Sequence, residues 1–210
     1  MKMETTFILK TIHWLGHSSV KISGEKIIYV DPYEIGDDEK ADIILITHDH
    51  DDHLSRGDIQ KIMGEKTILA APPIAAGKLN GEIRVVNPGD RLVIDHVEIE
   101  VVPAYNIGKH FHPKEKKGCG YVFKQNDVTY YHAGDTDSIP EMKHIQADVI
   151  FLPIGGTFTM NAEEAAKVVR DIQPQIAVPI HWGSIVGSRK DAEKFKHLCG
   201  DRAYILEREN

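Results

Sequence analysis

The chain has 210 residues, 41% of them hydrophobic, and a formal net charge of −7 at pH 7. This length and composition allow one full core, so we expect a single domain over residues 1–210. The negative charge argues against a broad nucleic-acid-binding surface, because phosphate contacts need clustered Lys and Arg. No apolar run approaches the length of a membrane helix or of a signal peptide, so we expect no membrane span. With only Cys119 and Cys199 available, a disulfide framework is excluded and a cytoplasmic location is expected.

The first part of the chain is predicted to be mainly strands. A first strand is expected through 7–9 and 12–15, closed by Gly16, and the runs 17–22 and 27–30 are typical of a hairpin. The apolar run 43–46 indicates a buried strand. Further strands are expected at 67–70, 83–86, 91–94 and 97–102, with a short helix opened by Pro72-Pro73.

Residues 47–53, Thr-His-Asp-His-Asp-Asp-His, are the most informative stretch. His48, His50, Asp52 and His53 fit the spacing H-x-H-x-D-H, directly after the strand at 43–46. Ser55 follows as a helix N-cap, so these side chains lie on a turn between a strand's carboxyl end and a helix. Imidazole and carboxylate groups this closely spaced suit a pair of transition metal ions. The alternative is a polar surface turn that takes up metal adventitiously.

Other candidate site residues follow strands elsewhere. His17 and Asp31 come at strand ends, and we expect His17 to contact the substrate or to support the ligands. A tight glycine turn after the strand at 128–131 delivers Asp135, a candidate bridging ligand, because one carboxylate can hold two cations about 3.5–4 Å apart. His181 follows the strand at 176–180 and is a further ligand type.

The second part of the chain continues with strands and helices. Strands are expected at 120–123, 128–131, 148–152, 176–180 and 203–206, with helices at 140–142, 161–170 and 191–198. Two strand-rich halves, divided near Lys116, suggest two stacked sheets with helices outside. The long irregular stretch 103–113 is typical of a functional or mobile loop. The basic cluster 109–117 is either a solvated loop or a rim for an anionic substrate.

Three motifs occur in order along the chain: His48-x-His50-x-Asp52-His53, Gly134-Asp135-Thr136 and Ile180-His181-Trp182-Gly183. Together they resemble the metallo-β-lactamase fold superfamily over essentially the whole chain. Finer features resemble small bacterial and archaeal metal-dependent hydrolases akin to the ascorbate-phosphate lactonase and N-acyl-phosphatidylethanolamine phospholipase D branches. These features are Trp14–Ser19, Tyr131–Thr136 and Leu152–Thr157.

The resemblance implies an α/β fold, a four-layer αββα sandwich of two mixed sheets with helices outside. It also implies ligand roles for two divalent transition metal ions, with zinc favoured and manganese or iron as alternatives. His48 and His50 would bind the first ion, Asp52 and His53 the second. Asp135 would bridge both ions, and His181 would complete the second site.

The superfamily usually supplies a third histidine to the first ion from the loop after the strand that ends at Val102. Here that place is Ala104-Tyr105-Asn106. Either Asn106 substitutes through its carbonyl, or His112, with His110 as the lesser alternative, folds back from the loop. We predict His112, because imidazole suits these ions better than a neutral amide.

These ligands predict hydrolysis of an ester, lactone or phosphodiester bond in a small, potentially anionic substrate. The ions lower the pKa of a shared water and stabilise the oxyanion formed on attack. Asp52 is expected to align the hydroxide, and His17, Tyr105 and His132 are candidates to protonate the leaving group. The alternatives are a non-catalytic or weakly active metal-binding sensor and a nuclease-type phosphodiesterase. The sequence leaves homo-oligomerisation open.

Overall fold

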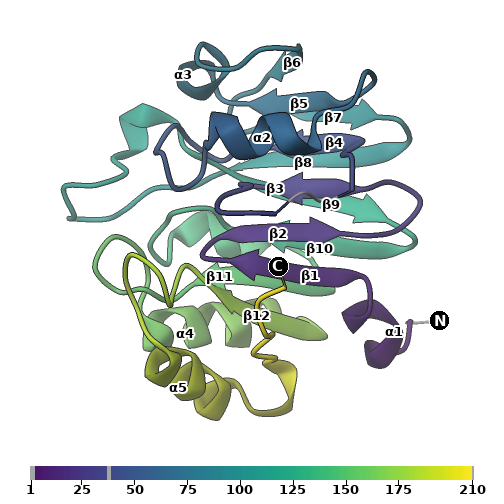
Figure 1. Cartoon of the computed structure of the whole chain (residues 1–210). Helices are drawn as coiled ribbons and strands as arrows, with labels where there is room; N and C mark the ends of the chain where they lie inside the picture. The colour runs from purple at the N-terminus through teal and green to yellow at the C-terminus, as the bar shows by residue number, and fades with distance from the viewer. Residues whose placement is uncertain (1–2, 37–38, 210) are drawn as a thin grey trace.

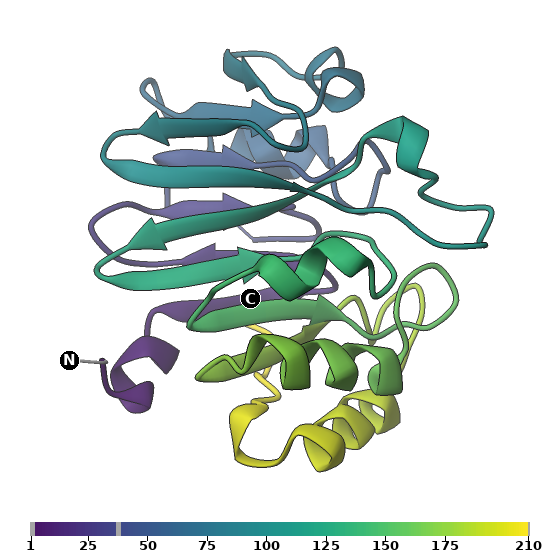
Figure 2. The same cartoon turned by 180° about the vertical axis from the view of Figure 1, so that it is seen from behind.

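The computed structural model describes residues 3–36 and 39–209. Two six-stranded sheets lie face to face, and each mixes parallel and antiparallel pairs (Figures 1 and 2). The first sheet has the spatial order β1 (Ile12–Gly16), β2 (Ser19–Ile22), β3 (Ile28–Val30), β4 (Ile43–Leu45), β5 (Ile68–Ala71), β6 (Glu82–Val85). The second runs, in reverse chain order, through β12 (Ile176–Ile180), β11 (Val149–Pro153), β10 (Val128–His132), β9 (Cys119–Gln125), β8 (Val97–Pro103), β7 (Arg91–Ile94).

The helices lie outside the sheets. The α-helices are α1 (Thr5–Leu9), α2 (Arg56–Ile62), α3 (Pro73–Ala76), α4 (Ala162–Ile172) and α5 (Arg189–Cys199). Short 3₁₀ turns are η1 (Lys114–Lys116), η2 (Pro140–His144) and η3 (Gly200–Arg202). Helix α2 lies over the first sheet, and α4 and α5 lie beside β11 and β12 of the second (Figure 1). The predicted αββα sandwich is therefore confirmed.

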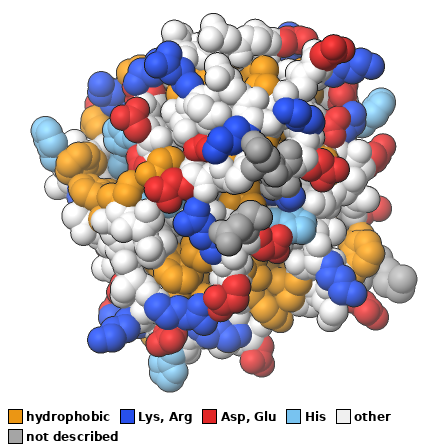
Figure 3. Space-filling model, in the orientation of Figure 1, with side chains coloured by type: hydrophobic (Ala, Val, Ile, Leu, Met, Phe, Trp, Pro, Cys, Tyr) orange, Lys and Arg blue, Asp and Glu red, His pale blue; other side chains and the backbone are white. Residues whose placement is uncertain are grey.

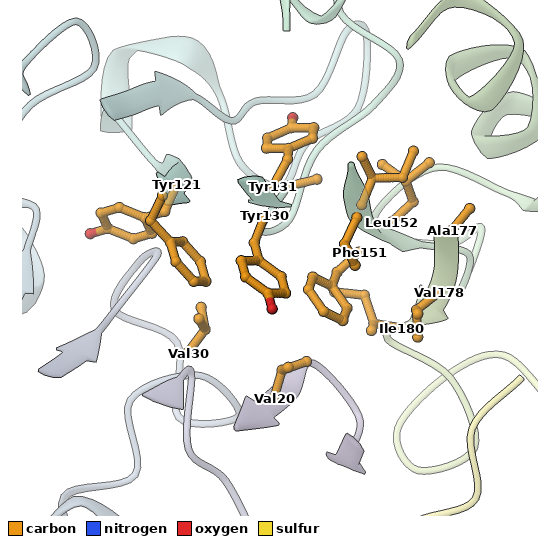
Figure 4. Close-up of a cluster of buried hydrophobic side chains, with 14 of the residues drawn as sticks. Val20, Val30, Tyr121, Tyr130, Tyr131, Phe151, Leu152, Ala177, Val178 and Ile180 are labelled. Atoms are coloured by element: carbon orange, nitrogen blue, oxygen red, sulfur yellow. The ribbon is translucent and has the colours of Figure 1, made fainter. Parts of the chain in front are cut away.

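The strands β3 and β4 are apolar on both faces because both faces are buried. Val30 and Leu45 face the second sheet, whereas Tyr29 and Ile44 belong to a separate cluster with α2 residues. Figure 4 shows the space between the sheets, where Val20 and Val30 point toward aromatic side chains of the second sheet. This packing fixes the register of the strands, since a slip of one residue would exchange the two faces.

Helix boundaries follow the capping residues. Ser55 caps α2 by accepting a hydrogen bond from the Asp58 backbone N–H, and Asn161 forms a reciprocal capping box with Glu164 at α4. Gln173 ends α4 in the left-handed conformation, ahead of Pro174. Both helices were expected, α2 after the Ser55 N-cap and α4 over residues 161–170.

Three expectations about the fold are wrong. Residues 7–9 belong to helix α1, with the Phe7 and Ile8 amides bonded to the Glu4 carbonyl; three apolar residues are too few to distinguish a strand from a helical turn. The run 203–206 is not a strand, because its pairing with β12 stops at the single bridge from Ala203 to Ala177. The chain passes between the sheets at 86–90, not near Lys116, since β8 and β9 pair directly across the long loop 104–118.

Within the described ranges, no helix is both long and apolar enough to cross a membrane. Both cysteines are free thiols. The pairs β3–β4, β10–β11 and β11–β12 are parallel, so the carboxyl ends of these strands share one edge of the sandwich. Polar groups that follow these strands are thereby brought together, as is common in α/β proteins.

Candidate metal centre

The histidine motif forms a tight turn after β4. The backbone N–H groups of His53 and Leu54 donate to the His50 carbonyl at 3.0 and 2.8 Å, which folds the turn back on itself. At its start, the Thr47 N–H donates to Asp31 Oδ1 at 2.8 Å. The turn is thus tied to the end of β3 and held at the edge of the sheet.

A first group of ligand atoms comes from this turn and from the loop 104–118. His50 Nδ1 lies 3.1 Å from His48 Nε2 and 3.1 Å from His112 Nε2. The ligand atoms of the three histidines all lie within 4.8 Å of one another. His112 adopts a left-handed backbone conformation, φ 51°, that turns its ring back toward the motif.

A second group lies beside the first and draws on both sheets. Asp52 Oδ2 is 3.6 Å from His53 Nε2 and 3.0 Å from His17 Nε2. The rings of His17 and His181 have centroids 4.1 Å apart. Ligand atoms of these four residues also lie within 4.8 Å of one another.

Asp135 lies between the two groups. Its Oδ1 is 3.3 Å from His53 Nε2, and its Oδ2 is 3.0 Å from His181 Nε2 and 3.4 Å from His112 Nε2. The carboxylate is 4% exposed. The glycine turn that delivers it is crowded: a Cβ on Gly134, at φ +64°, would meet the Cys119 carbonyl oxygen at 2.6 Å.

Hydrogen-bond partners on the side away from the centre orient the histidines. Asp31, fully buried, accepts from His53 Nδ1 at 2.8 Å and from the Thr47 hydroxyl at 2.7 Å. The same hydroxyl lies 2.9 Å from His48 Nδ1, and the Phe158 carbonyl accepts from His112 Nδ1 at 3.2 Å. With Nδ1 occupied, each of these histidines presents Nε2 to the centre. The roles of Thr47 and Phe158 escaped the sequence analysis, although Thr47 adjoins the motif; a backbone carbonyl leaves no sequence signal.

The chemistry of this donor set fits transition metal ions. His53 Nε2 and Asp135 Oδ1 are buried and face each other, yet neither has a hydrogen-bond partner among the described residues. Such orphaned atoms are costly unless a further group binds them. Burial lowers the pKa of His48 and of His112, which keeps their lone pairs available near neutral pH. Burial alone would raise the pKa of Asp135, but His181 and His53 hold it well below its ordinary value.

The remaining candidate residues from the sequence have other partners or lie outside the two ligand groups. Both His132 nitrogens are engaged, Nε2 with the Ser18 carbonyl and Nδ1 with the Gly134 N–H. The Tyr105 hydroxyl, expected at the centre, instead donates to Glu141 Oε2 at 2.9 Å, because its side chain turns to the opposite side of the loop. Asn106 donates to the Phe111 and Phe158 carbonyls, so it braces the loop that carries His112. His110 belongs to neither ligand group.

Two hollows flank His112. One, of about 310 Å³, is lined by residues of the first group and by apolar side chains of the loop 104–118 and α3. The other, of about 500 Å³, lies on the His181 side with Phe158 and Ile185 in its wall. A molecule in either hollow reaches the ligand groups directly.

Comparison with known proteins identifies the family of this chain. A family model described as a β-lactamase superfamily domain matches residues 11–181. A UPF0173 metal-dependent hydrolase of Pyrococcus furiosus is 37% identical, over 93% of this chain and 94% of its own. The chain therefore belongs to the β-lactamase superfamily and, within it, to the UPF0173 family of metal-dependent hydrolases.

Solved structures share this fold. A protein of Parabacteroides distasonis described as a metal-dependent hydrolase has a TM-score of 0.84 and 34% identity, covering 94% of this chain and 93% of that chain. Igni18, a metallo hydrolase from the archaeon Ignicoccus hospitalis, shares the fold with a TM-score of 0.77 at 20% identity, covering 95% of each chain.

Proposed function

We propose that this chain hydrolyses an ester, lactone or phosphodiester bond of a small substrate, using two divalent transition metal ions, with zinc favoured over manganese or iron. His48, His50 and His112 would hold one ion, and Asp52, His53 and His181 the other. The position of Asp135 carries this proposal. Its Oδ2 lies 3.4 Å from His112 Nε2 of the first group and 3.0 Å from His181 Nε2 of the second, so one carboxylate is within reach of both proposed ions.

When bound, the ions would acidify water and stabilise negative charge on a substrate oxygen. The residues of the chain supply orientation. Asp52 keeps 21% of its side chain exposed, so it faces the solvent from which water enters. Burial alone would raise its pKa, but the hydrogen bond from His17 and the nearby charges of His53 and His17 together outweigh burial, so the pKa lies below its ordinary value. Asp52 is thus an ionised acceptor that can align an attacking water.

Of the three candidate acids, His17 is the one that lies within the second ligand group. Its Nε2 bonds Asp52, while its Nδ1 is buried without a hydrogen-bond partner among the described residues. Trp14 fixes the backbone at this point, because its indole N–H donates to the His17 carbonyl at 3.0 Å. We assign His17 the positioning of Asp52. Tyr105 receives no catalytic role, since its hydroxyl is held by Glu141.

We place the activity nearest the lactonase and phospholipase D-like branch. The stretch Trp14–Ser19, one of the three on which this placement depends, includes His17 of the second ligand group, and Trp14 stacks on Trp182 with ring centroids 4.7 Å apart. A nuclease role has less support. Besides the net charge of −7, acidic and basic side chains are interspersed on the face shown in Figure 3.

The test is reconstitution of metal-free protein with Zn²⁺, Mn²⁺ or Fe²⁺ separately, followed by a hydrolysis screen of phosphodiesters, lactones, esters and thioesters. Asp52→Asn and His181→Ala should each lower turnover by about 100-fold or more while the protein stays folded. Asp127→Asn, in the turn between β9 and β10, is the matched control and should retain full activity. Full activity in Asp52→Asn and His181→Ala would reject the proposal. Tight metal binding with no turnover in the screen would favour the non-catalytic sensor instead.

A further inference from the structure

The cavity of about 310 Å³ beside the first ligand group has a definite chemical character. The part of its lining formed by His48, His50 and His112, the histidine end, is the first ligand group. Its volume lies at the lower end of the range for small-ligand sites, about 300–1,000 Å³. The occupant is therefore a small molecule or one segment of a substrate, with its reacting bond at the histidine end.

The side walls of this cavity are apolar. Ile74 of α3 and Phe111 of the loop 104–118 line it and remain 40% and 45% exposed. Ala104 and Pro113 complete the apolar lining. Two large hydrophobic side chains left open to solvent around a concave site are covered favourably by an apolar group, at about 25 cal/mol per Å² of area removed from water.

The lining of this cavity also includes a lysine side chain, Lys116. Lys109 forms an ion pair with Asp137, and Lys114 forms one with Glu141, so both charges are neutralised within the fold. Lys116, in contrast, forms no ion pair with any residue of the ranges 3–36 and 39–209, and it lines the cavity. Lys117 lines a different hollow, next to Pro88 and Tyr105.

The acidic groups of the lining do not cancel this charge. Asp49 Oδ2 is bound by Lys78 Nζ at 2.7 Å. Asp135 is at the histidine end, where it is surrounded by ligand-type histidines. Lys116 thus remains available to an anion that enters from solvent.

We propose that the substrate carries an apolar segment next to the scissile bond and an anionic group, carboxylate or phosphate, that binds Lys116. This inference rests on the proposed function, because it assumes that the bond to be cleaved lies at the histidine end. For an ester, hydrolysis breaks the acyl C–O bond, adds the hydroxyl of water to the acyl carbon, and returns a proton to the alcohol oxygen.

The first test measures binding without turnover, by calorimetric titration of the metal-loaded protein. The probes are the monoamide of adipic acid, the phosphonate analogue of the same length, and hexanamide, which has no charge. The anionic probes should bind about five- to tenfold more tightly than hexanamide, and less so at high salt. Lys116→Ala should remove that preference, while the matched control Lys117→Ala should keep it. Of the two anionic probes, the one whose affinity falls more in Lys116→Ala carries the group that this lysine binds better.

A second variant tests the apolar wall. Ile74→Ser should weaken all three probes by a similar factor, whereas Val93→Ser, at a 67% exposed side chain of β7, should weaken none. Equal binding of charged and uncharged probes to the wild type, or an unchanged preference in Lys116→Ala, would overturn the inference. An anion preference in a protein that hydrolyses nothing would instead contradict the proposed function and leave the pocket assignment standing.

Discussion

Asp31 binds His53 Nδ1 at 2.8 Å with the same oxygen that accepts the hydroxyl of Thr47 at 2.7 Å. Since Thr47 in turn contacts His48, one buried carboxylate orients a histidine from each ligand group. Asp31 itself sits at a positive φ of 47°, where the chain leaves β3. The alignment of the two groups therefore depends on a residue that belongs to neither group.

Asp31→Asn is the sharpest test of this relationship, because Asn tolerates a positive φ and keeps the shape of the side chain. The amide has one acceptor oxygen instead of two, so it cannot serve both the Thr47 backbone N–H and the pair formed by His53 and the Thr47 hydroxyl. Metal affinity should therefore fall by about 10- to 100-fold. Competition with a chromophoric chelator measures it, and Asp127→Asn, also at a positive φ, is the control. Unchanged metal affinity in a folded Asp31→Asn protein would show that Asp31 does not orient the ligand histidines.

Gly134→Ala should displace Asp135, because the added Cβ meets the Cys119 carbonyl oxygen and the Thr47 side chain. We expect both ions to bind at least about tenfold more weakly. Gly89→Ala is the matched control: Gly89 also has a positive φ, yet a Cβ there meets nothing within 4 Å. The prediction fails if both variants lose metal affinity to the same extent, since backbone strain would then suffice.

His112→Ala should selectively weaken one of two metal-binding steps, since the loop 104–118 contributes this histidine to the first group. Metal content per chain after dialysis, measured by elemental analysis, should fall toward one. His110→Ala should leave the metal content unchanged, because His110 belongs to neither group. The opposite pattern would assign the third imidazole to His110.

Asp58 provides a test of stability against pH, away from the centre. Burial alone would raise its pKa, but hydrogen bonds from Lys61, Ser55 and the Glu34 backbone outweigh it and lower the pKa. A depressed pKa in the folded state means that the ionised group stabilises the fold above its unfolded pKa of about 4, and that this stability is lost as the pH falls through the folded value.

Asp58→Asn should therefore lower the free energy of unfolding by about 1 kcal/mol at pH 7, and by less at pH 3. Urea denaturation at both pH values measures the difference. A destabilisation that grows as the pH falls would contradict the lowered pKa of Asp58 in the folded state.

The sequence predicted most of the strands and the ligand-type residues because both carry local signals. Apolar runs such as 43–46 mark buried strands, and the H-x-H-x-D-H spacing marks a site. The route of residues 86–90 between the sheets carries no such signal, since it depends on long-range pairing of β8 with β9. The side-chain direction of Tyr105 was equally hidden, because it is set by Glu141, which lies 36 positions further along the chain.

The ligand assignment is tested most directly by anomalous diffraction from crystals of the protein loaded with Zn²⁺. We expect two peaks, one on either side of Asp135. One peak should lie within about 2.0–2.2 Å of ligand atoms from His48, His50 and His112, and the other equally close to ligand atoms from Asp52, His53 and His181. A single peak, or peaks that leave Asp135 uncoordinated, would contradict the shared carboxylate and with it the proposed two-ion hydrolase.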